Sequence, residues 1–200
     1  MRIKVCGVTR PEDARAAVEL GAWAIGMILS PRGPRYLERA RARLVREEIP
    51  EGTLAVGVFV DEGAETVNEL ARELELDMVQ LHGSETPELL ERLERPAIKA
   101  FALGAAPDLA PWAGAWGALL EGTERGRPFD WSLAPGAGAR ILLAGGLTPE
   151  NAGRAASVPG VHALDVSSGV ESRPGEKSRE KLEAFFSAVR ARDPRGAGPP

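Results

Sequence analysis

Cysteine and histidine are scarce in this sequence of 200 residues, which contains one Cys, Cys6, and two His. A single Cys excludes a disulfide within the chain, and together with two His it cannot complete a structural zinc cluster. Because disulfides are typical of oxidising compartments, their absence favours a reduced, cytoplasmic setting. The sequence therefore predicts a cytoplasmic protein without a metal centre.

Excess positive charge and long apolar runs are also missing. The formal net charge is -4, and Lys occurs only at Lys4, Lys99, Lys177 and Lys181. Nucleic-acid and acidic-membrane partners require a basic excess, so we expect neither. No apolar run approaches the roughly 20 residues that span a bilayer, and the N-terminus lacks a signal-peptide core.

The sequence contains a regular alternation of apolar, strand-like segments and amphipathic, helix-like segments. Strands are predicted at 2–6, 22–29, 54–60, 77–82, 97–102, 117–121, 140–144 and 162–166. Helices are predicted at 11–20, 37–48, 63–75, 86–94, 149–157 and 177–191. The segments after the fifth and sixth strands are rich in Pro and Gly and predict only poorly formed helices.

Eight strand–helix units predict an α/β protein with a single (β/α)8 TIM barrel over residues 1–192. The alternative is an open, doubly wound sheet. That fold often has a G-x-G-x-x-G turn after its first strand, and the sequence there, CGVTRPED, does not match it. Residues 193–200 have the composition of a disordered tail.

Polar side chains are predicted to gather inside the barrel near the C-terminal ends of several strands. Strand alternation places Lys4 and Cys6 on the inner face of the first strand, and Ile3 and Val5 on its outer face. On three other strands the same alternation places inside the barrel Met78, Gln80, His82, Leu119, Glu121 and Asp165. Barrel enzymes carry their chemistry at this end. Lys4 is costly to bury unpaired, and we expect Asp165 on the neighbouring last strand to pair with it.

Two glycine-containing turns follow the last two strands. The turn AGGLTPEN carries Gly145 and Gly146 before a helix start, and DVSSGVE carries Ser167, Ser168 and Gly169. Backbone N–H groups at such positions bind anions, and many barrels bind phosphate after these strands. The two turns together predict a phosphate site.

Cys6 ends the first strand, where the N-termini of the surrounding helices direct their dipoles to the barrel mouth. Such surroundings, with a nearby Arg, can lower the pKa of a thiol and make it a base or a nucleophile. The alternative is a buried Cys that acts as a small apolar side chain. A redox sensor is a weaker reading, because the chain has no second Cys to resolve it.

The motifs KVCGVT, SPRGPRY, VGVFVD, VQLHG, FDWS, AGGLTPENA and DVSSGVE, taken in this order, resemble those of the phosphoribosylanthranilate isomerase family. The resemblance extends from Lys4 to about Phe186. It implies conversion of N-(5-phosphoribosyl)anthranilate to 1-(2-carboxyphenylamino)-1-deoxyribulose 5-phosphate, an Amadori rearrangement of tryptophan biosynthesis that uses no cofactor. The implied partner is a small phosphosugar substrate, and the oligomeric state, monomer or homodimer, stays open.

The resemblance also implies roles for single residues. The general base of the family falls on Cys6, and the Arg that holds the anthranilate carboxylate falls on Arg35. The family's general acid is an Asp in an L-L-D context, where this sequence has Leu119-Leu120-Glu121. We therefore expect Glu121 to be the acid, with Asp165 or Glu124 as alternatives. Gln80 and His82 either line the substrate pocket or complete the polar packing, and Trp131 is expected to be a packing residue.

Two other functions are compatible with parts of this pattern. The histidine-pathway isomerase and the α barrel of tryptophan synthase also bind phosphosugars. They use paired carboxylates, however, and neither predicts Cys at the end of the first strand. A non-catalytic phosphate-binding barrel that has lost its acid is the alternative outside the enzymes, and Glu121 is the feature that leaves it open.

Overall fold

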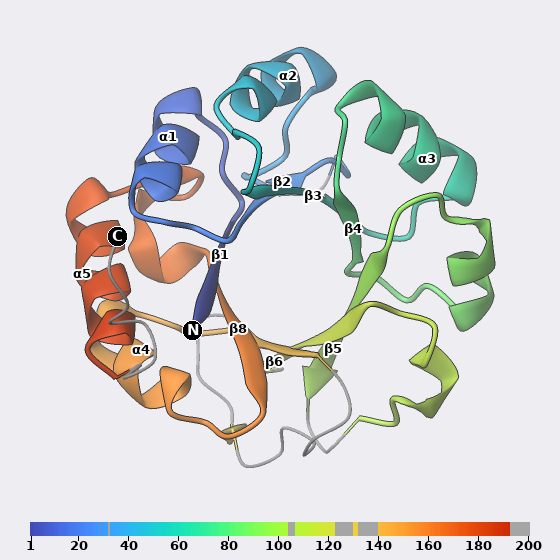
Figure 1. The fold of residues 1–200 in the computed structure, drawn as a ribbon. Helices are drawn as coiled ribbons and strands as arrows, with labels where there is room; N and C mark the ends of the chain where they lie inside the picture. Colours follow the sequence, from blue (N-terminus) through green and yellow to red (C-terminus); the bar gives the residue numbers. More distant parts are fainter. Residues whose placement is uncertain (32, 104–106, 123–129, 132–139, 193–200) are drawn as a thin grey trace.

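The computed structural model describes residues 1–31, 33–103, 107–122, 130–131 and 140–192. Eight parallel strands form a closed barrel in the order β1-β2-β3-β4-β5-β6-β7-β8, with helices outside it (Figure 1). The strands are β1 (Arg2–Cys6), β2 (Ala24–Ile28), β3 (Leu54–Phe59), β4 (Met78–Leu81), β5 (Ala97–Leu103), β6 (Gly117–Gly122), β7 (Ile141–Leu143) and β8 (Val161–Val166). The barrel prediction is confirmed, because β8 pairs with β1 and leaves no open edge.

Five α-helices lie within the described ranges: α1 (Pro11–Glu19), α2 (Arg39–Glu47), α3 (Ala64–Glu73), α4 (Pro149–Ala156) and α5 (Arg179–Arg190). Each was predicted within a few residues. The α4 helix starts with the expected signals, since Thr148 directly precedes Pro149 and forms a capping box with Asn151. No helix formed by the described residues is long and apolar enough to cross a bilayer.

The predicted α-helix over 86–94 is wrong in type. The chain there forms only a 3₁₀ helix, η1 (Pro87–Arg92), which begins after Thr86. The preceding turn is held by Glu85, whose carboxylate accepts hydrogen bonds from the Gly83 amide and from Lys99. The observed 3₁₀ helix starts at Pro87, one residue later than the predicted helix.

After β5 the described residues form only one 3₁₀ turn, η2 (Ala110–Trp112), as the prolines there predicted. The segment between β6 and β7, with Glu124, and the predicted tail at 193–200 lie outside the described residues apart from 130–131.

A short antiparallel hairpin that the sequence did not predict follows β8. It comprises β9 (Glu171–Arg173) and β10 (Glu176–Lys177), and it is preceded by the 3₁₀ turn η4 (Ser168–Val170). The last helix consequently starts at Arg179 with Ser178 as its N-cap, and not at 177.

The barrel has two cores. The inner one is built of small and medium apolar side chains on inward-facing strand positions: Ala24, Val56, Met78, Ile98, Ala100, Leu119, Leu142, Ala144 and Ala163. The outer one lies between strands and helices and includes Ile3, Val5 and the α5 aromatics Phe185 and Phe186. The predicted inward direction of Met78 and Leu119, and the outward direction of Ile3 and Val5, are confirmed.

Candidate functional site

The polar residues that the sequence predicted lie at the C-terminal ends of the strands. Cys6 is the last residue of β1, and Glu121 and Asp165 are the penultimate residues of β6 and β8. His82 directly follows β4. Because all strands of the barrel are parallel, these side chains share one rim.

The Cys6 side chain is buried, with 7% of its surface exposed, and it faces the inner side of the barrel. Its register partner on β2 is Gly26, at which an added Cβ would lie 2.8 Å from the Cys6 Sγ. The sulfur therefore occupies the space that a side chain at Gly26 would need. Burial raises the pKa of the Cys6 thiol, and the charges of Lys4 and Lys177 only partly oppose this. The expected lowering of the thiol pKa is thus not what the free protein shows, because desolvation outweighs the nearby cations.

Lys4 and Asp165 form the ion pair that the sequence predicted. The two residues face each other in the β1–β8 register, and the Lys4 Nζ donates to Asp165 Oδ1 at 2.8 Å. Lys4 is completely buried. Burial lowers the pKa of Lys4, but the charges of Asp165 and Cys6 outweigh burial and raise it overall. Lys4 is therefore a permanent cation below the thiol.

Gln80, His82 and Glu121 form a chain of hydrogen bonds across the rim. The Gln80 Nε2 lies 2.8 Å from His82 Nδ1, and the His82 Nε2 lies 2.8 Å from Glu121 Oε1. Gln80 is fully buried, whereas about a third of the His82 and Glu121 side chains is exposed. If the Gln80 amide donates to Nδ1, the proton of a neutral imidazole lies on Nε2 and is donated to Glu121. His82 thus connects a buried amide to the carboxyl group at the barrel mouth.

The two glycine turns lie against each other. Gly145 and Gly146 adopt positive φ angles of 79° and 64°. A Cβ at Gly169 would lie 1.8 Å from the Leu147 carbonyl oxygen, so only glycine lets the second turn approach the first. The predicted phosphate-binding residues Gly145, Gly146, Ser167, Ser168 and Gly169 are thereby brought to adjoining turns.

Arg35 is held by a residue that the sequence did not single out. Its Nε and NH2 donate to the two carboxylate oxygens of Glu171 at 2.8 and 2.7 Å, which raises the pKa of the Arg35 guanidinium. The Arg35 stem crosses Gly7, where an added Cβ would lie 2.6 Å from the Arg35 Cδ. Gly7 therefore allows the arginine to pass directly over the end of β1.

Glu171 and Lys177, on the β9–β10 hairpin, are the main polar residues of this region that sequence reasoning missed. Lys177 Nζ donates to Glu171 Oε1 at 2.9 Å, to the Cys6 carbonyl at 2.7 Å and to the Ser167 carbonyl at 3.2 Å. The only available signal was that two of the four lysines fall just after the DVSSGVE motif. Nothing in the composition indicated that Glu171 and Lys177 are buried.

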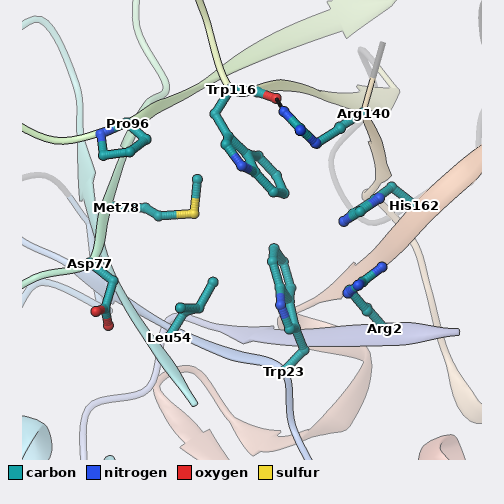
Figure 2. A pocket seen from close by; sticks show the side chains of 9 residues that line it. All are labelled: Arg2, Trp23, Leu54, Asp77, Met78, Pro96, Trp116, Arg140 and His162. Atoms are coloured by element: carbon teal, nitrogen blue, oxygen red, sulfur yellow. Dashed lines mark hydrogen bonds between the residues drawn. The ribbon is translucent and has the colours of Figure 1, made fainter. Parts of the chain in front are cut away.

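A cavity of about 400 Å³ opens at the other end of the barrel, at the N-terminal ends of the strands. Figure 2 shows Trp23 and Trp116 extending toward each other from opposite sides, with His162, Arg2 and Arg140 on one side of them. The two indole rings stack at 5.6 Å, and both tryptophans pack against the inner core. Burial lowers the pKa of His162, and the nearby guanidinium charges lower it further. This aromatic cluster closes the base of the barrel interior, and none of the predicted site residues lies in it.

The described residues contain no cluster of His, Cys, Asp and Glu that could hold a metal ion. Trp131 is a buried packing residue, as expected, with the Arg154 guanidinium 4.9 Å from its ring centroid. The candidate site thus offers a buried thiol, a carboxyl–imidazole pair, a clamped arginine and two glycine turns.

Comparison with known proteins identifies the family. The family model described as N-(5'phosphoribosyl)anthranilate (PRA) isomerase matches residues 3–188. The N-(5'-phosphoribosyl)anthranilate isomerase of Pseudomonas fluorescens is 43% identical over 201 aligned positions, covering 95% of this chain and 96% of that protein. The relative from Acidithiobacillus ferrooxidans is 40% identical, and the alignment covers 95% of this chain and 98% of that protein.

Solved structures agree in fold as well as in sequence. The phosphoribosyl anthranilate isomerase of Thermus thermophilus superposes with a TM-score of 0.89 at 40% identity, covering 96% of this chain and 99% of that one. A phosphoribosyl anthranilate isomerase in complex with reduced 1-(o-carboxyphenylamino)-1-deoxyribulose 5-phosphate superposes with a TM-score of 0.83 at 34% identity, with the same coverage. The chain therefore belongs to the N-(5'-phosphoribosyl)anthranilate isomerase family, the isomerases of tryptophan biosynthesis whose motifs it carries.

Proposed function

We propose that this protein converts N-(5-phosphoribosyl)anthranilate to 1-(2-carboxyphenylamino)-1-deoxyribulose 5-phosphate by an Amadori rearrangement, without a cofactor. The family match over residues 3–188 supports the reaction, and so does the related isomerase bound to the reduced product. The reaction needs a general acid, a general base, and groups that hold a phosphate and a carboxylate. The rim supplies one candidate for each.

Glu121 is the proposed general acid. It protonates the ribose ring oxygen, so that the C1–O bond breaks and the sugar opens as a Schiff base. The 2.8 Å contact between Glu121 and His82 supports this role, since the imidazole can exchange a proton with the carboxyl group. Glu121 stands where the family has Asp, and its longer stem still reaches the imidazole.

Cys6 is the proposed general base that removes the proton from C2 of the Schiff base. The resulting enolamine then takes up a proton at C1 and loses the proton of its C2 hydroxyl, which gives the ketone. Because burial raises the pKa of Cys6 in the free protein, the thiolate depends on the surrounding cations. Lys4 lies on the same strand two residues earlier and is a permanent positive charge.

The remaining groups bind the two ends of the substrate. The Arg35 guanidinium is fixed by Glu171 through two of its N–H groups, and we infer that its other N–H groups hold the anthranilate carboxylate. The amides of Gly145 and Gly146 make no hydrogen bond to another described residue, which suits them to a phosphate. Ser167, Ser168 and Gly169 complete this proposed cradle. Gln80 and Asp165 are proposed to support the acid and Lys4, respectively, from inside the barrel.

The observation that carries the proposal is the common rim of the Cys6 thiol, the His82–Glu121 pair and the two glycine turns. The test is conversion of the anthranilate ribotide by the purified protein, followed by loss of substrate fluorescence, with Cys6→Ala and Glu121→Ala as comparisons. We expect turnover by the parent protein and losses of at least about a hundredfold in both variants. Binding of the reduced product without any turnover by the parent protein would instead support the non-catalytic phosphate-binding barrel.

The proposed partner is the phosphosugar substrate, and we propose neither a nucleic-acid nor a membrane partner. A related isomerase from Thermotoga maritima is described as dimeric. For this chain we propose either a monomer or a homodimer, and sedimentation velocity at micromolar concentration distinguishes them.

A further inference from the structure

Lys177 is the feature of the site region that the proposed reaction leaves unexplained. Its side chain has no exposed surface, although it ends a two-residue strand of a surface hairpin. Burial of an ammonium group is costly, so the fold must gain something from it. The contacts of the ammonium group show what it holds.

The three acceptors of Lys177 come from three separate parts of the proposed site. They are the carbonyl of Cys6 at the end of β1, the carbonyl of Ser167 at the start of the second glycine turn, and the carboxylate of Glu171. The two carbonyl groups can only accept hydrogen bonds, and Glu171 can donate one only when it is protonated. Burial lowers the pKa of Lys177. A neutral amine, however, has two N–H groups for these three acceptors, so the geometry favours the ammonium form.

Glu171 extends the network to Arg35. Its Oε1 accepts from both Lys177 and the Arg35 Nε, and its Oε2 accepts from the Arg35 NH2. Lys177 is fixed from its backbone as well, because its amide donates to Asp13 Oδ2 at 3.0 Å. The ammonium group therefore joins the proposed base, the proposed phosphate cradle and the proposed carboxylate clamp.

The charges around the thiol make its state depend on Lys177. The charged groups that interact with Cys6 are Lys4 on its own strand, Arg35 beyond β2, Asp165 on β8 and Lys177 on β10. Glu171 lies between Arg35 and Lys177. With a neutral thiol, the three cations exceed the two carboxylates by one charge, and a Cys6 thiolate balances the cluster. Removal of Lys177 would remove that excess and leave the thiolate less favoured.

We propose that Lys177 is a positioning residue of the isomerase, whose buried ammonium group fixes the Cys6 and Ser167 backbone and stabilises the Cys6 thiolate. This inference rests on the proposed function in that it takes Cys6 as the base. Its direct readout, however, is the ionisation of the thiol and does not require turnover.

The test uses the fact that Cys6 is the only cysteine of the chain. Thiolate absorbance near 240 nm is followed against pH, with the Cys6→Ser protein subtracted as the blank. In Lys177→Met we expect the thiolate fraction at a given pH below the midpoint to fall about tenfold, a pKa rise of about one unit. The limb of the kcat/KM pH profile that reports the base should move by the same amount. Lys177→Arg, which keeps the charge, should restore most of the thiolate fraction.

Lys181→Met is the matched control. Lys181 donates to the Glu171 backbone carbonyl at 2.7 Å and so contacts the same hairpin, but it has no contact with Cys6. We expect its thiol titration to match that of the parent protein. If Lys177→Met does not fold, as judged by circular dichroism, Lys177→Gln takes its place, because an amide can still donate to the carbonyls without carrying charge.

An unchanged thiol titration in the charge-removing variant would overturn the proposal, even if the variant were less stable or less active. A shifted titration in a parent protein that turns over no ribotide would uphold the role of Lys177 and refute the proposed function. The two inferences therefore fail separately.

Discussion

Replacement of Gly26 by Ala should damage catalysis by displacing the proposed base, Cys6. Gly26 lies on β2 beside Cys6, and a Cβ there would meet Cys6 Sγ at 2.8 Å and Cys6 Cα at 3.1 Å. Ordinary van der Waals contact needs about 3.5 Å or more, so the sulfur must move by about 0.7 Å or the two strands must separate. The backbone atoms of β1 cannot swing away, which leaves the thiol to take up most of the displacement.

The expected loss follows from the sensitivity of proton transfer to position. A misplacement of about 1 Å can cost on the order of a hundredfold in rate, so kcat should fall by about 10 to 100 times. Overpacking of this kind also costs about 1–3 kcal/mol in the free energy of unfolding. The proposed phosphate cradle follows β7 and β8, so the affinity for the reduced product should change by less than about threefold.

The assay combines kcat and KM for the ribotide with urea unfolding. Gly63→Ala is the matched control, because Gly63 has an ordinary φ of -72° and an added Cβ there meets nothing within 4 Å. Because Cys6→Ala removes the sulfur, the double variant Gly26→Ala/Cys6→Ala should recover part of the stability that Gly26→Ala loses. A Gly26→Ala protein with the kcat of the parent, or a double variant with simply additive losses, would show that the sulfur does not occupy this space.

Three further outcomes are expected from the rim. Glu121→Gln should lower kcat by about 10² to 10⁴ while affinity for the reduced product is kept, since only the proton is lost; near-normal turnover would move the acid to Asp165. Arg35→Lys should raise KM about tenfold or more, because one ammonium cannot reproduce the paired contacts with Glu171, and an unchanged KM would exclude the carboxylate clamp. Burial raises the pKa of Glu171, but Arg35 and Lys177 outweigh it and lower the pKa overall. Glu171 therefore stabilises the fold above its unfolded pKa of about 4.3, and this contribution is lost as pH falls through the lower native pKa. As pH falls from neutral to acid, the urea midpoint should decrease less steeply in Glu171→Gln than in the parent protein. Equal slopes would contradict the stabilising role assigned to Glu171.

The barrel could be predicted from sequence because its signals are local. Each strand is a short apolar run, and the α1 start at Pro11 and the α4 start at Thr148 carry capping signals. Strand alternation then placed Lys4, Cys6 and Glu121 on the inner face, and the register of β1 with β8 produced the Lys4–Asp165 pair. The chemistry-bearing rim follows from periodicity and topology alone.

What could not be predicted depends on contacts between distant segments. The 3₁₀ turn at 87–92 stands where an α-helix was predicted, and it follows a turn that Lys99, 14 residues from Glu85, contacts through the Glu85 carboxylate. The β9–β10 hairpin has too few residues to show a strand period. The direction of the Cys6 pKa shift depends on how deeply the thiol is buried, which no sequence pattern reports.

The replacement of the family's Asp by Glu121 is consistent with the surrounding backbone. Gly145 follows β7 with φ of 79°, and a Cβ there would lie 3.2 Å from the Glu121 Cβ. Because Asp and Glu share this Cβ, the missing side chain at Gly145 makes room for either residue at position 121. The Glu121 carboxyl group meets the His82 Nε2 at 2.8 Å, and the imidazole is itself within 2.8 Å of Gln80. The departure from the family pattern is therefore compatible with the proposed role of Glu121 as the acid.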